Sequence, residues 1–436
     1  MRLSRTAGIA TLAAATLLLA TACSSASTAS TASTGSAAAT ETPTAPVTLT
    51  MWGTYGRGGN SAQADMLLKT IIPAFEKAHP TITVNYVDQN YDTLLQKLTT
   101  GAAGGTLPDL VRADIGWVPK LGALGVLTTL DQLMPDFQKL ADDTYAGILA
   151  TNKWQDHYYG LPLDTNTRVL MTNPTALKAA GLSKPPATFD ELKADAAAFK
   201  AKGISAFADS GTGGWNILPW IWSAGGDITS PDLTKASGYL DSPASVAGIQ
   251  LLADLYQQKA IPNLMTGNKG ATGTSDGMPK GMYANILDGP WMFGIWKGQY
   301  PTFKPLISPM PAGPGGSVSV VGGEDIVIPA SSPNQQAAAE FVRFSQSADY
   351  QLNMAKTGQV AVVESLAAQE AADEPYLAPF IEQLKNAKAR PPVPSYPKID
   401  DALSNYVAQA LEGKMTVQAA LTAAAQQIDG LLAQTS

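Results

Sequence analysis

Residues 47–52 read Val-Thr-Leu-Thr-Met-Trp and alternate apolar with polar side chains, which is the pattern of a strand. A helical pattern of apolar residues follows over residues 67–75, and residues 81–87 alternate again. The apolar positions of residues 94–98 indicate the next helix, and a short strand ends at Asp114. Strand, helix, strand, helix, strand at this spacing predicts a parallel sheet built from βαβ units, so the fold class is α/β.

Three later helices have start signals in the sequence. Residues 188–191 read Thr-Phe-Asp-Glu, a capping box in which the Thr oxygen and the Glu carboxylate satisfy free backbone N–H groups. Ser242-Pro243 and Ser332-Pro333 each pair an N-cap residue with a proline at the first helical position. These signals predict that helices alternate with strands beyond the first βαβ units.

Length and charge limit the function further. The expected folded body runs from Val47 to Gln434, about 390 residues, which is too long for one hydrophobic core and predicts two lobes. The net charge of −7 is spread along the chain, which argues against nucleic acid as a partner. The body contains no cysteine, so disulfides have no part in its stability.

The first 22 residues have the layout of a secretory signal peptide. They begin with two arginines, continue with an apolar run over residues 7–19 and end with small residues before Cys23, which is the chain's only cysteine. This segment resembles a bacterial lipobox, with Ala20 where leucine is the commonest residue. We therefore expect a lipoprotein signal peptide over residues 1–22 and lipid attachment at Cys23. A plain signal peptide cleaved near Ala22 is the alternative.

Residues 24–46 are almost entirely Ser, Ala and Thr. Such a segment buries too little apolar side chain to offset its ordering entropy, so residues 23–46 are predicted to be a flexible, lipid-anchored tether. A diacyl lipid on Cys23 would hold the body at the outer face of the bacterial cytoplasmic membrane.

Motifs that could carry catalysis do not fit their required contexts. Residues 273–277 match G-x-S-x-G, but no strand pattern precedes them and both histidines, His79 and His157, come earlier in the chain. Residues 395–398 match S-x-x-K, but the K-T-G at 356–358 lies on the wrong side of them. Neither histidine has metal-ligand spacing. We expect no enzyme activity, cofactor or metal. A lipid-anchored glycan hydrolase with two carboxylates stays as an alternative.

Four segments carry a resemblance to a known family. Residues 159–173 begin Tyr-Gly-Leu-Pro-Leu-Asp-Thr-Asn, residues 285–291 end Gly-Pro-Trp, residues 321–329 read Val-Gly-Gly-Glu-Asp-Ile-Val-Ile-Pro, and residues 413–421 precede the C-terminus. In this order they resemble segments of the extracellular solute-binding proteins of carbohydrate ABC importers (family 1), distant relatives of maltose-binding protein. The resemblance covers essentially all of residues 47–432.

This resemblance implies a two-lobed periplasmic-binding-protein-like (Venus flytrap) fold with three interlobe crossings. One lobe would take residues 47–163 and 322–370, and the other would take residues 164–321 and 371–436. A sugar or oligosaccharide would bind in the cleft, and lobe closure would be the signal read by the ABC permease. The resemblance also implies a monomer and a Gram-positive host. A protein of the same fold that binds a non-sugar solute is a further alternative.

Candidate ligand-binding residues follow from sugar chemistry and from this resemblance. Sugar rings offer an apolar C–H face to aromatic rings and a rim of hydroxyls to charged or amide groups. The candidates are Trp52, Tyr55, Arg57, Asp114, Trp117, Asp164, Asn166, Trp215, Trp291, Glu324, Tyr396 and Asp400. Among the other tryptophans, we expect Trp154 and Trp296 to pack, and at least one of Trp220 and Trp222 to lie in the core.

Several polar candidates also have purely structural interpretations. Arg57 could be solvated, and Asp114 could cap the helix that follows it. Asp164 and Asn166 could order the first crossing, and Glu324 could pair with Arg168 or Arg343. The sequence leaves these alternatives open.

Overall fold

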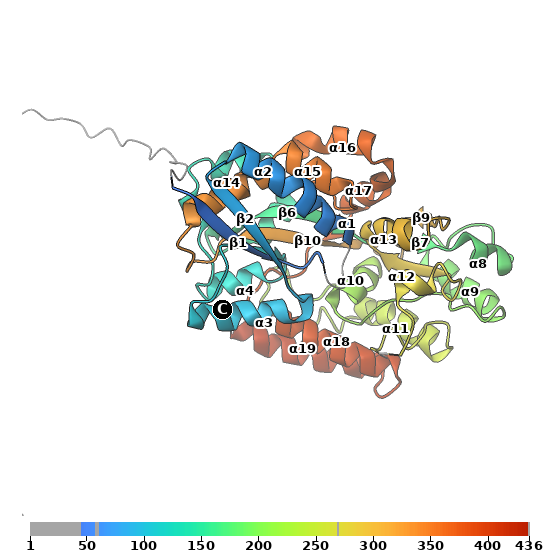
Figure 1. Ribbon diagram of the computed structural model, residues 1–436. Helices are drawn as coiled ribbons and strands as arrows, with labels where there is room; N and C mark the ends of the chain where they lie inside the picture. Colours follow the sequence, from blue (N-terminus) through green and yellow to red (C-terminus); the bar gives the residue numbers. More distant parts are fainter. Residues whose placement is uncertain (1–44, 57–60, 268–269, 435–436) are drawn as a thin grey trace, which may run out of the picture. The chain divides into compact units, whose positions relative to one another are not determined.

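The computed structural model describes residues 45–56, 61–267 and 270–434 (Figure 1). The predicted signal peptide, the lipid-attachment residue Cys23, the tether and Arg57 lie outside these residues. Within the described ranges, no helix is both long and apolar enough to cross a membrane.

The larger sheet has six strands and contains the predicted βαβ units. Its members are β1 (Val47–Gly53), β2 (Ile82–Asp88), β3 (Leu110–Asp114), β6 (Gly160–Thr167), β10 (Ser319–Val327) and β11 (Ala387–Lys388). The order is β11-β10-β3-β1-β2, with β6 on the other side of β10. β1 pairs in parallel with both β2 and β3, which confirms the parallel arrangement predicted from the first strands.

A smaller three-stranded sheet is antiparallel. It consists of β8 (Asn285–Asp288), β7 (Val169–Thr172) and β9 (Leu306–Ser308), with β7 in the middle. We call the part built around β1–β3 the first lobe and the part built around β7–β9 the second lobe. Because β7 follows β6 after one residue, the chain passes directly from the large sheet to the small one.

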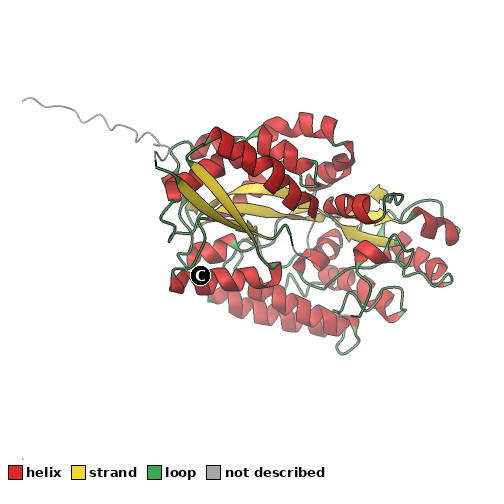
Figure 2. Cartoon of the chain, viewed as in Figure 1, coloured by secondary structure: helices red, strands yellow, loops and turns green. Residues whose placement is uncertain are grey.

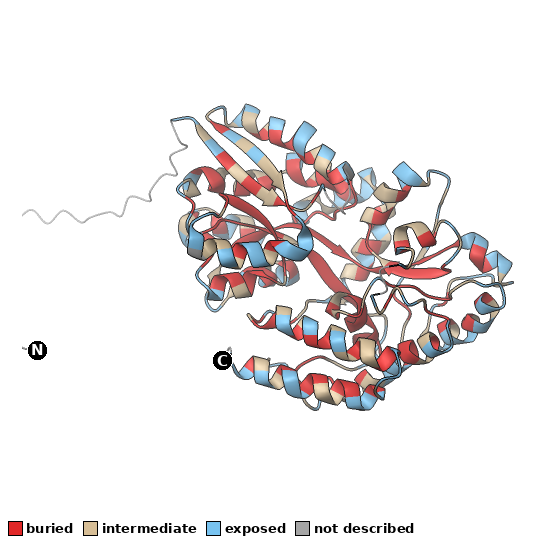
Figure 3. Cartoon of the chain, turned by 60° about the horizontal axis from the view of Figure 1, so that its bottom comes forward, coloured by how far each residue is buried: buried red, intermediate tan, exposed pale blue. Residues whose placement is uncertain are grey.

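Two buried strands connect the lobes. β6 and β10 pair antiparallel from Val321↔Thr167 to Val327↔Gly160, with an irregularity between Glu324 and Asp325. Both strands are buried along nearly their whole length (Figure 3). Gly323 has a φ of 131°, and a Cβ there would overlap the Asp164 carbonyl oxygen, so glycine is required at this point of the second crossing.

Helices cover the strands (Figure 2). In chain order the helical elements are α1 (Ser61–Met66), η1 (Leu67–Ile71), α2 (Ile72–Ala78), α3 (Tyr91–Gly104), α4 (Val118–Ala123), α5 (Leu130–Leu133), α6 (Phe137–Asp142), α7 (Ala146–Leu149), η2 (Ala150–Asn152), α8 (Pro174–Ala179), α9 (Phe189–Lys200), α10 (Gly214–Ser223), α11 (Pro243–Gln257), α12 (Thr274–Gly277), α13 (Trp291–Gln299), α14 (Gln335–Ser345), α15 (Ala348–Ala355), η3 (Glu364–Leu366), α16 (Ala367–Asp373), η4 (Pro375–Leu377), α17 (Ala378–Leu384), α18 (Tyr396–Leu411) and α19 (Val417–Ala433). β4 (Lys153–Trp154) and β5 (His157–Tyr158) pair as a separate two-stranded sheet.

Hydrophobic clusters follow the two lobes. One cluster joins β1 and β2 to α2 and α14, and another joins α9, α10 and α11 to α18 and α19. Trp220 and Trp222 are both buried in the second of these clusters, and Trp296 is buried beside β7, so their predicted packing roles are confirmed. Trp154 is partly buried in β4.

Two of the three predicted helix starts are confirmed. The Thr188 and Ser242 hydroxyls accept hydrogen bonds from backbone N–H groups at the starts of α9 and α11. The prediction at Ser332 is wrong, because α14 begins at Gln335. The Ser332 hydroxyl donates to the buried carboxylate of Asp109 at 2.6 Å and accepts from the Asn334 N–H at 3.1 Å, so it fixes the turn before α14.

Glu370 in α16 is a buried carboxyl, and burial raises its pKa to about 7. Since the unfolded chain loses this proton near pH 4.5, the folded protein loses stability as pH rises from about 4.5 to about 7. The charge-free variant Glu370→Gln escapes this loss. We expect its free energy of unfolding, relative to that of the wild type, to be about 2–3 kcal/mol higher at pH 8 than at pH 4. Urea unfolding of both proteins at pH 4 and pH 8 measures these free energies. The same difference between variant and wild type at both pH values would contradict the prediction.

Candidate functional site

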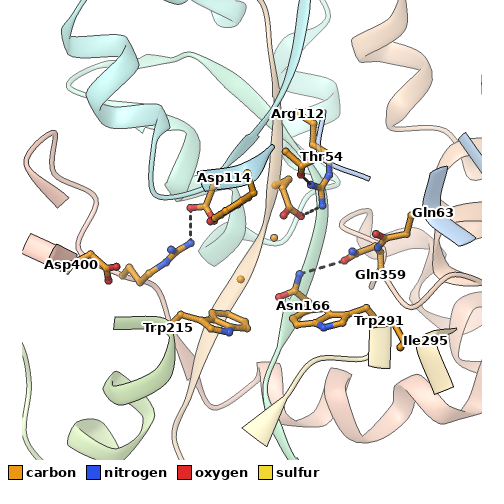
Figure 4. A pocket seen from close by; sticks show the side chains of 15 residues that line it. Thr54, Gln63, Arg112, Asp114, Asn166, Trp215, Trp291, Ile295, Gln359 and Asp400 are labelled. Atoms are coloured by element: carbon orange, nitrogen blue, oxygen red, sulfur yellow. Dashed lines mark hydrogen bonds and ion pairs between the residues drawn. The ribbon is translucent and has the colours of Figure 1, made fainter. Parts of the chain in front are cut away.

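A cavity of about 490 Å³ lies at the carboxyl ends of β1 and β3, with side chains from both lobes in its wall (Figure 4). Its lining comprises Thr54, Gln63, Tyr91, Arg112, Asp114, Asn166, Trp215, Trp291, Ile295, Gly322, Gly323, Glu324, Gln359, Arg390 and Asp400. This is the position at which open α/β sheets bind ligands, because the loops that leave the strand ends diverge there.

One wall of the cavity is aromatic. Trp215 is the second residue of α10 and Trp291 is the first residue of α13, and their ring centroids are 6.1 Å apart at an interplanar angle of 31°. Figure 4 shows the two indoles on one side of the cavity, facing Asp114, Arg112 and Thr54. Each ring packs against a glycine: Trp215 against Gly322 of β10, and Trp291 against Gly289 in the turn before α13. A Cβ at either would overlap the neighbouring indole, so these glycines allow the rings to pack closely.

Arg168, between β6 and β7, holds the backbone that carries Trp215. Its guanidinium donates to the Trp215 carbonyl oxygen at 3.0 Å and to both carboxylate oxygens of Asp209 at 2.8 Å. It also donates to the Leu287 carbonyl oxygen, and it lies 5.5 Å from the Trp215 ring centroid. The Nη1 and Nη2 atoms of Arg168 are therefore bonded within the second lobe, and Arg168 does not pair with Glu324 as one sequence interpretation suggested.

The opposite wall is charged, and Arg112 of β3 is its centre. Its guanidinium forms an ion pair with Glu324 at 2.5 Å and a hydrogen bond to the Thr54 hydroxyl at 2.8 Å. It lies 4.1 Å from the ring centroid of Tyr55, whose hydroxyl donates to Asp164 at 3.1 Å. Tyr55 and Asp164 thus form a layer behind Arg112.

Opposing electrostatic effects act on the Glu324 carboxyl in this wall. Burial raises the pKa of the Glu324 carboxyl well above its usual range, the Arg112 charge opposes that rise, and the nearby Asp164 carboxylate adds to it. Glu324 lines the cavity, its neighbour Asp325 is fully buried, and the pairing of β10 with β6 is irregular between the two residues. The charges of Arg112 and Asp164 therefore influence whether Glu324 is a carboxylate, which only accepts hydrogen bonds, or a carboxylic acid, which can also donate one.

A second arginine links Asp114 to the start of α18. Arg390 donates to Asp114 Oδ1 at 2.8 Å and lies 5.7 Å from the ring centroid of Tyr396. The Tyr396 hydroxyl donates to Asp400 at 3.1 Å, and Asp400 accepts a hydrogen bond of 2.6 Å from the backbone N–H of Gly214. Burial raises the pKa of Asp400. This chain of contacts runs from β3 to the residue that precedes Trp215.

The predicted residues occupy three kinds of place. Those in the cavity lining are Asp114, Asn166, Trp215, Trp291, Glu324 and Asp400. Tyr55, Asp164 and Tyr396 lie behind it, each in contact with Arg112 or Arg390 of the lining. Trp52 and Trp117 pack in a core cluster beside β3, and Arg57 lies outside the described residues. The Asp114 carboxylate also accepts from the Gly116 N–H at 2.7 Å, but it does not cap the following helix, because α4 begins at Val118 and has no side-chain cap.

Sequence reasoning missed several lining residues, namely Thr54, Gln63, Tyr91, Arg112, Ile295, Gln359 and Arg390. A signal existed for three of them. Thr54 and Tyr91 lie just beyond the carboxyl ends of β1 and β2, and Arg112 lies in the second half of β3, near the edge at which open α/β sheets bind ligands. Gln359 lies near Asn166 only through tertiary structure, as their 3.3 Å hydrogen bond joins residues 193 positions apart.

Described side chains include no cluster of three or more His, Cys, Asp or Glu residues that could hold a metal ion. The cavity instead combines a flat apolar wall with hydrogen-bonding groups already held by ion pairs. Such a surface suits a ligand that has both an apolar face and several hydroxyls.

Relatives in sequence and in structure are binding proteins of the same kind. A protein of Brucella abortus (strain 2308) that is named as a binding protein is 28% identical over 385 residues, covering 85% of this chain and 91% of the relative. The GacH receptor of Streptomyces glaucescens, solved unliganded and with acarbose, has the same fold with a TM-score of 0.80 at 24% identity, covering 89% of this chain and 99% of that one.

A second solved structure is an ABC transporter solute-binding protein from Thermotoga lettingae bound with α-D-tagatose. It has a TM-score of 0.78 at 26% identity and covers 88% of this chain and 99% of that one. These matches show that the α/β body has the two-lobed fold of periplasmic sugar-binding proteins. The model of the bacterial extracellular solute-binding protein family matches residues 58–352, and the chain belongs to that family.

Proposed function

We propose that this protein binds a sugar or oligosaccharide in the cavity between its lobes and delivers it to the membrane subunits of an ABC importer. The observation that carries the proposal is the pair of adjacent indoles, Trp215 and Trp291, opposite a wall of fixed hydrogen-bonding groups. Indole faces match the C–H faces of pyranose rings, and charged groups make the stronger hydrogen bonds to hydroxyls. The tagatose complex of the Thermotoga relative supports the same ligand class.

Binding would drive lobe closure. The lining includes Arg112 and Asp114 of the first lobe and Trp215 and Trp291 of the second, so a ligand in contact with both walls favours the closed form. The buried strands β6 and β10 are the crossings about which the lobes would move.

We keep the lobe boundaries predicted from the sequence as part of the proposal, with one refinement. Ala355 and Val360 pack in a cluster with β7 and α13 of the second lobe. Val362 and Val363 pack with Ile115 and Ile148 of the first lobe, so the refinement is that residues 355–363 contact both lobes.

Calorimetric titration tests the ligand class. The purified body is titrated with α-D-tagatose, maltose and maltotriose, and each mixture is then chromatographed. We expect saturable heat from at least one sugar, which is recovered unchanged. Shortened oligosaccharide would support the glycan hydrolase, and no response to sugars would support a non-sugar solute.

We propose a non-enzymatic role because the carboxylates of Glu324 and Asp114 are each engaged by an arginine.

Localisation is the second part of the proposal. A diacyl lipid on Cys23 would tether the body, as a monomer, to the outer face of the cytoplasmic membrane of a Gram-positive bacterium, near its permease. The lipobox-like residues 20–23 and the extracellular character of the family support this.

Cys23→Ser is expected to release the protein into the medium without altering sugar affinity, because the cysteine precedes the folded body. Fractionation of cells and medium with an antibody measures the release. A Cys23→Ser protein that stays with the membrane fraction as fully as the wild type would contradict lipid attachment at this residue.

A further inference from the structure

Tyr91 is an aromatic side chain of the first lobe that faces the cavity and has no role assigned above. It is the first residue of α3, just beyond the carboxyl end of β2, and it lines the cavity. The residue is 44% exposed. Trp215 and Trp291 line the same cavity from the second lobe.

Two contacts fix the orientation of the Tyr91 ring. Its hydroxyl donates to Asp114 Oδ2 at 2.8 Å, and its ring centroid lies 5.2 Å from that of Trp117, at an interplanar angle of 39°. Trp117 is 9% exposed and packs in the cluster beside β3, so it is a firm support. The ring is therefore held in place in a residue that lines the cavity and is 44% exposed.

Asp114 is itself fixed by groups other than Tyr91. Its Oδ1 accepts from Arg390 at 2.8 Å and from the Gly116 N–H at 2.7 Å, which leaves Oδ2 for the Tyr91 hydroxyl. Both carboxylate oxygens are thus engaged by protein groups. This favours a structural role for Asp114 toward Tyr91 over direct contact with a sugar.

We propose that Tyr91 is the stacking surface that the first lobe contributes to the bound sugar, and that Asp114 and Trp117 are positioning residues that hold its ring. This inference rests on the proposed sugar-binding function. A ring that is already immobilised loses little conformational entropy when a ligand packs on it, so its contact contributes to affinity more fully than that of a mobile side chain. Tyr91 on one lobe and the two indoles on the other would then enclose the sugar when the lobes close.

Three substitutions separate the ring from its hydroxyl. Tyr91→Phe keeps the flat ring and loses the bond to Asp114, whereas Tyr91→Leu and Tyr91→Ala remove the flat surface. Titration with α-D-tagatose, maltose and maltotriose is expected to show about threefold weaker binding for Tyr91→Phe and about tenfold or weaker for the other two. Tyr239→Ala, at a tyrosine outside the cavity lining, is the control and should bind as the wild type does.

A double-mutant cycle tests the positioning role of Asp114. Asp114→Asn is expected to weaken binding severalfold in the wild type and to have little further effect in Tyr91→Ala, because its effect passes through the ring. Melting temperatures of the ligand-free variants show that each one is folded. Fully additive losses would show that Asp114 contacts the sugar itself and would overturn its assigned role.

The outcomes distinguish this inference from the proposed function. If the wild type binds a sugar and Tyr91→Ala binds it equally well, the stacking role of Tyr91 is wrong and the proposed function stands. If the wild type binds none of the sugars, the proposed function fails, and the inference fails with it.

Discussion

A variant that carries both Trp215→Ala and Trp291→Ala is expected to bind sugar at least about a hundredfold more weakly than the wild type, a loss of about 2.7 kcal/mol. The two rings form one continuous apolar wall, with centroids 6.1 Å apart, so a single truncation leaves part of that wall in place. Trp291→Ala alone should therefore lose about tenfold. Calorimetric titration of the single and double variants measures these losses.

Trp220 provides the matched control for this prediction, because it lies on the same helix as Trp215 and is fully buried in the core. Trp220→Ala is expected to lower the free energy of unfolding by about 3–5 kcal/mol. The ligand-free Trp215/Trp291 variants should lose much less, since both rings are only partly buried. A loss of stability in the double variant as large as that of Trp220→Ala would show that the two rings belong to the core.

Arg168→Met is expected to lower the free energy of unfolding by about 3–5 kcal/mol, because it leaves the Asp209 carboxylate without its cation in the protein interior. Arg168 is 2% exposed, and burial already raises the pKa of Asp209 against the opposing charge of Arg168. The Trp215 carbonyl oxygen also loses its donor. Sugar affinity should therefore fall as well, under conditions in which the variant is still folded.

Arg343→Met is the control for this substitution. Arg343 pairs with Asp136 and Glu340, but all three side chains are partly exposed, so its loss should cost below about 1 kcal/mol. Urea unfolding of both variants provides the comparison. If Arg168→Met were no less stable than Arg343→Met, the buried ion pair would not be what holds the start of α10.

Local patterns were sufficient for the parts of the fold that depend on neighbouring residues. The alternation in residues 47–52 and 81–87 predicted β1 and β2, and the parallel pairing followed from the helix between them. The Thr188 cap was predictable because its partner lies three residues away. The hydrogen bond from Ser332 to Asp109 was not predictable, because it joins residues 223 positions apart.

The candidate site shows the same dependence on distance along the chain. Trp215 and Trp291 were predicted from residue type and family resemblance, and both line the cavity. Arg390 gave no signal, because its contact with Asp114 joins residues 276 positions apart. Trp117 and Tyr91 show a subtler limit: the sequence indicates an aromatic residue near a strand end but not which ring faces the cavity and which supports it.

A crystal structure of the protein with the sugar that binds most tightly in the calorimetric series tests the central claim most directly. We expect a sugar ring against the faces of Trp215 and Trp291, with its hydroxyls in contact with groups of the first lobe. A sugar bound away from this cavity, or an empty cavity in crystals grown at saturating sugar, would contradict the claim that these two indoles form the binding surface.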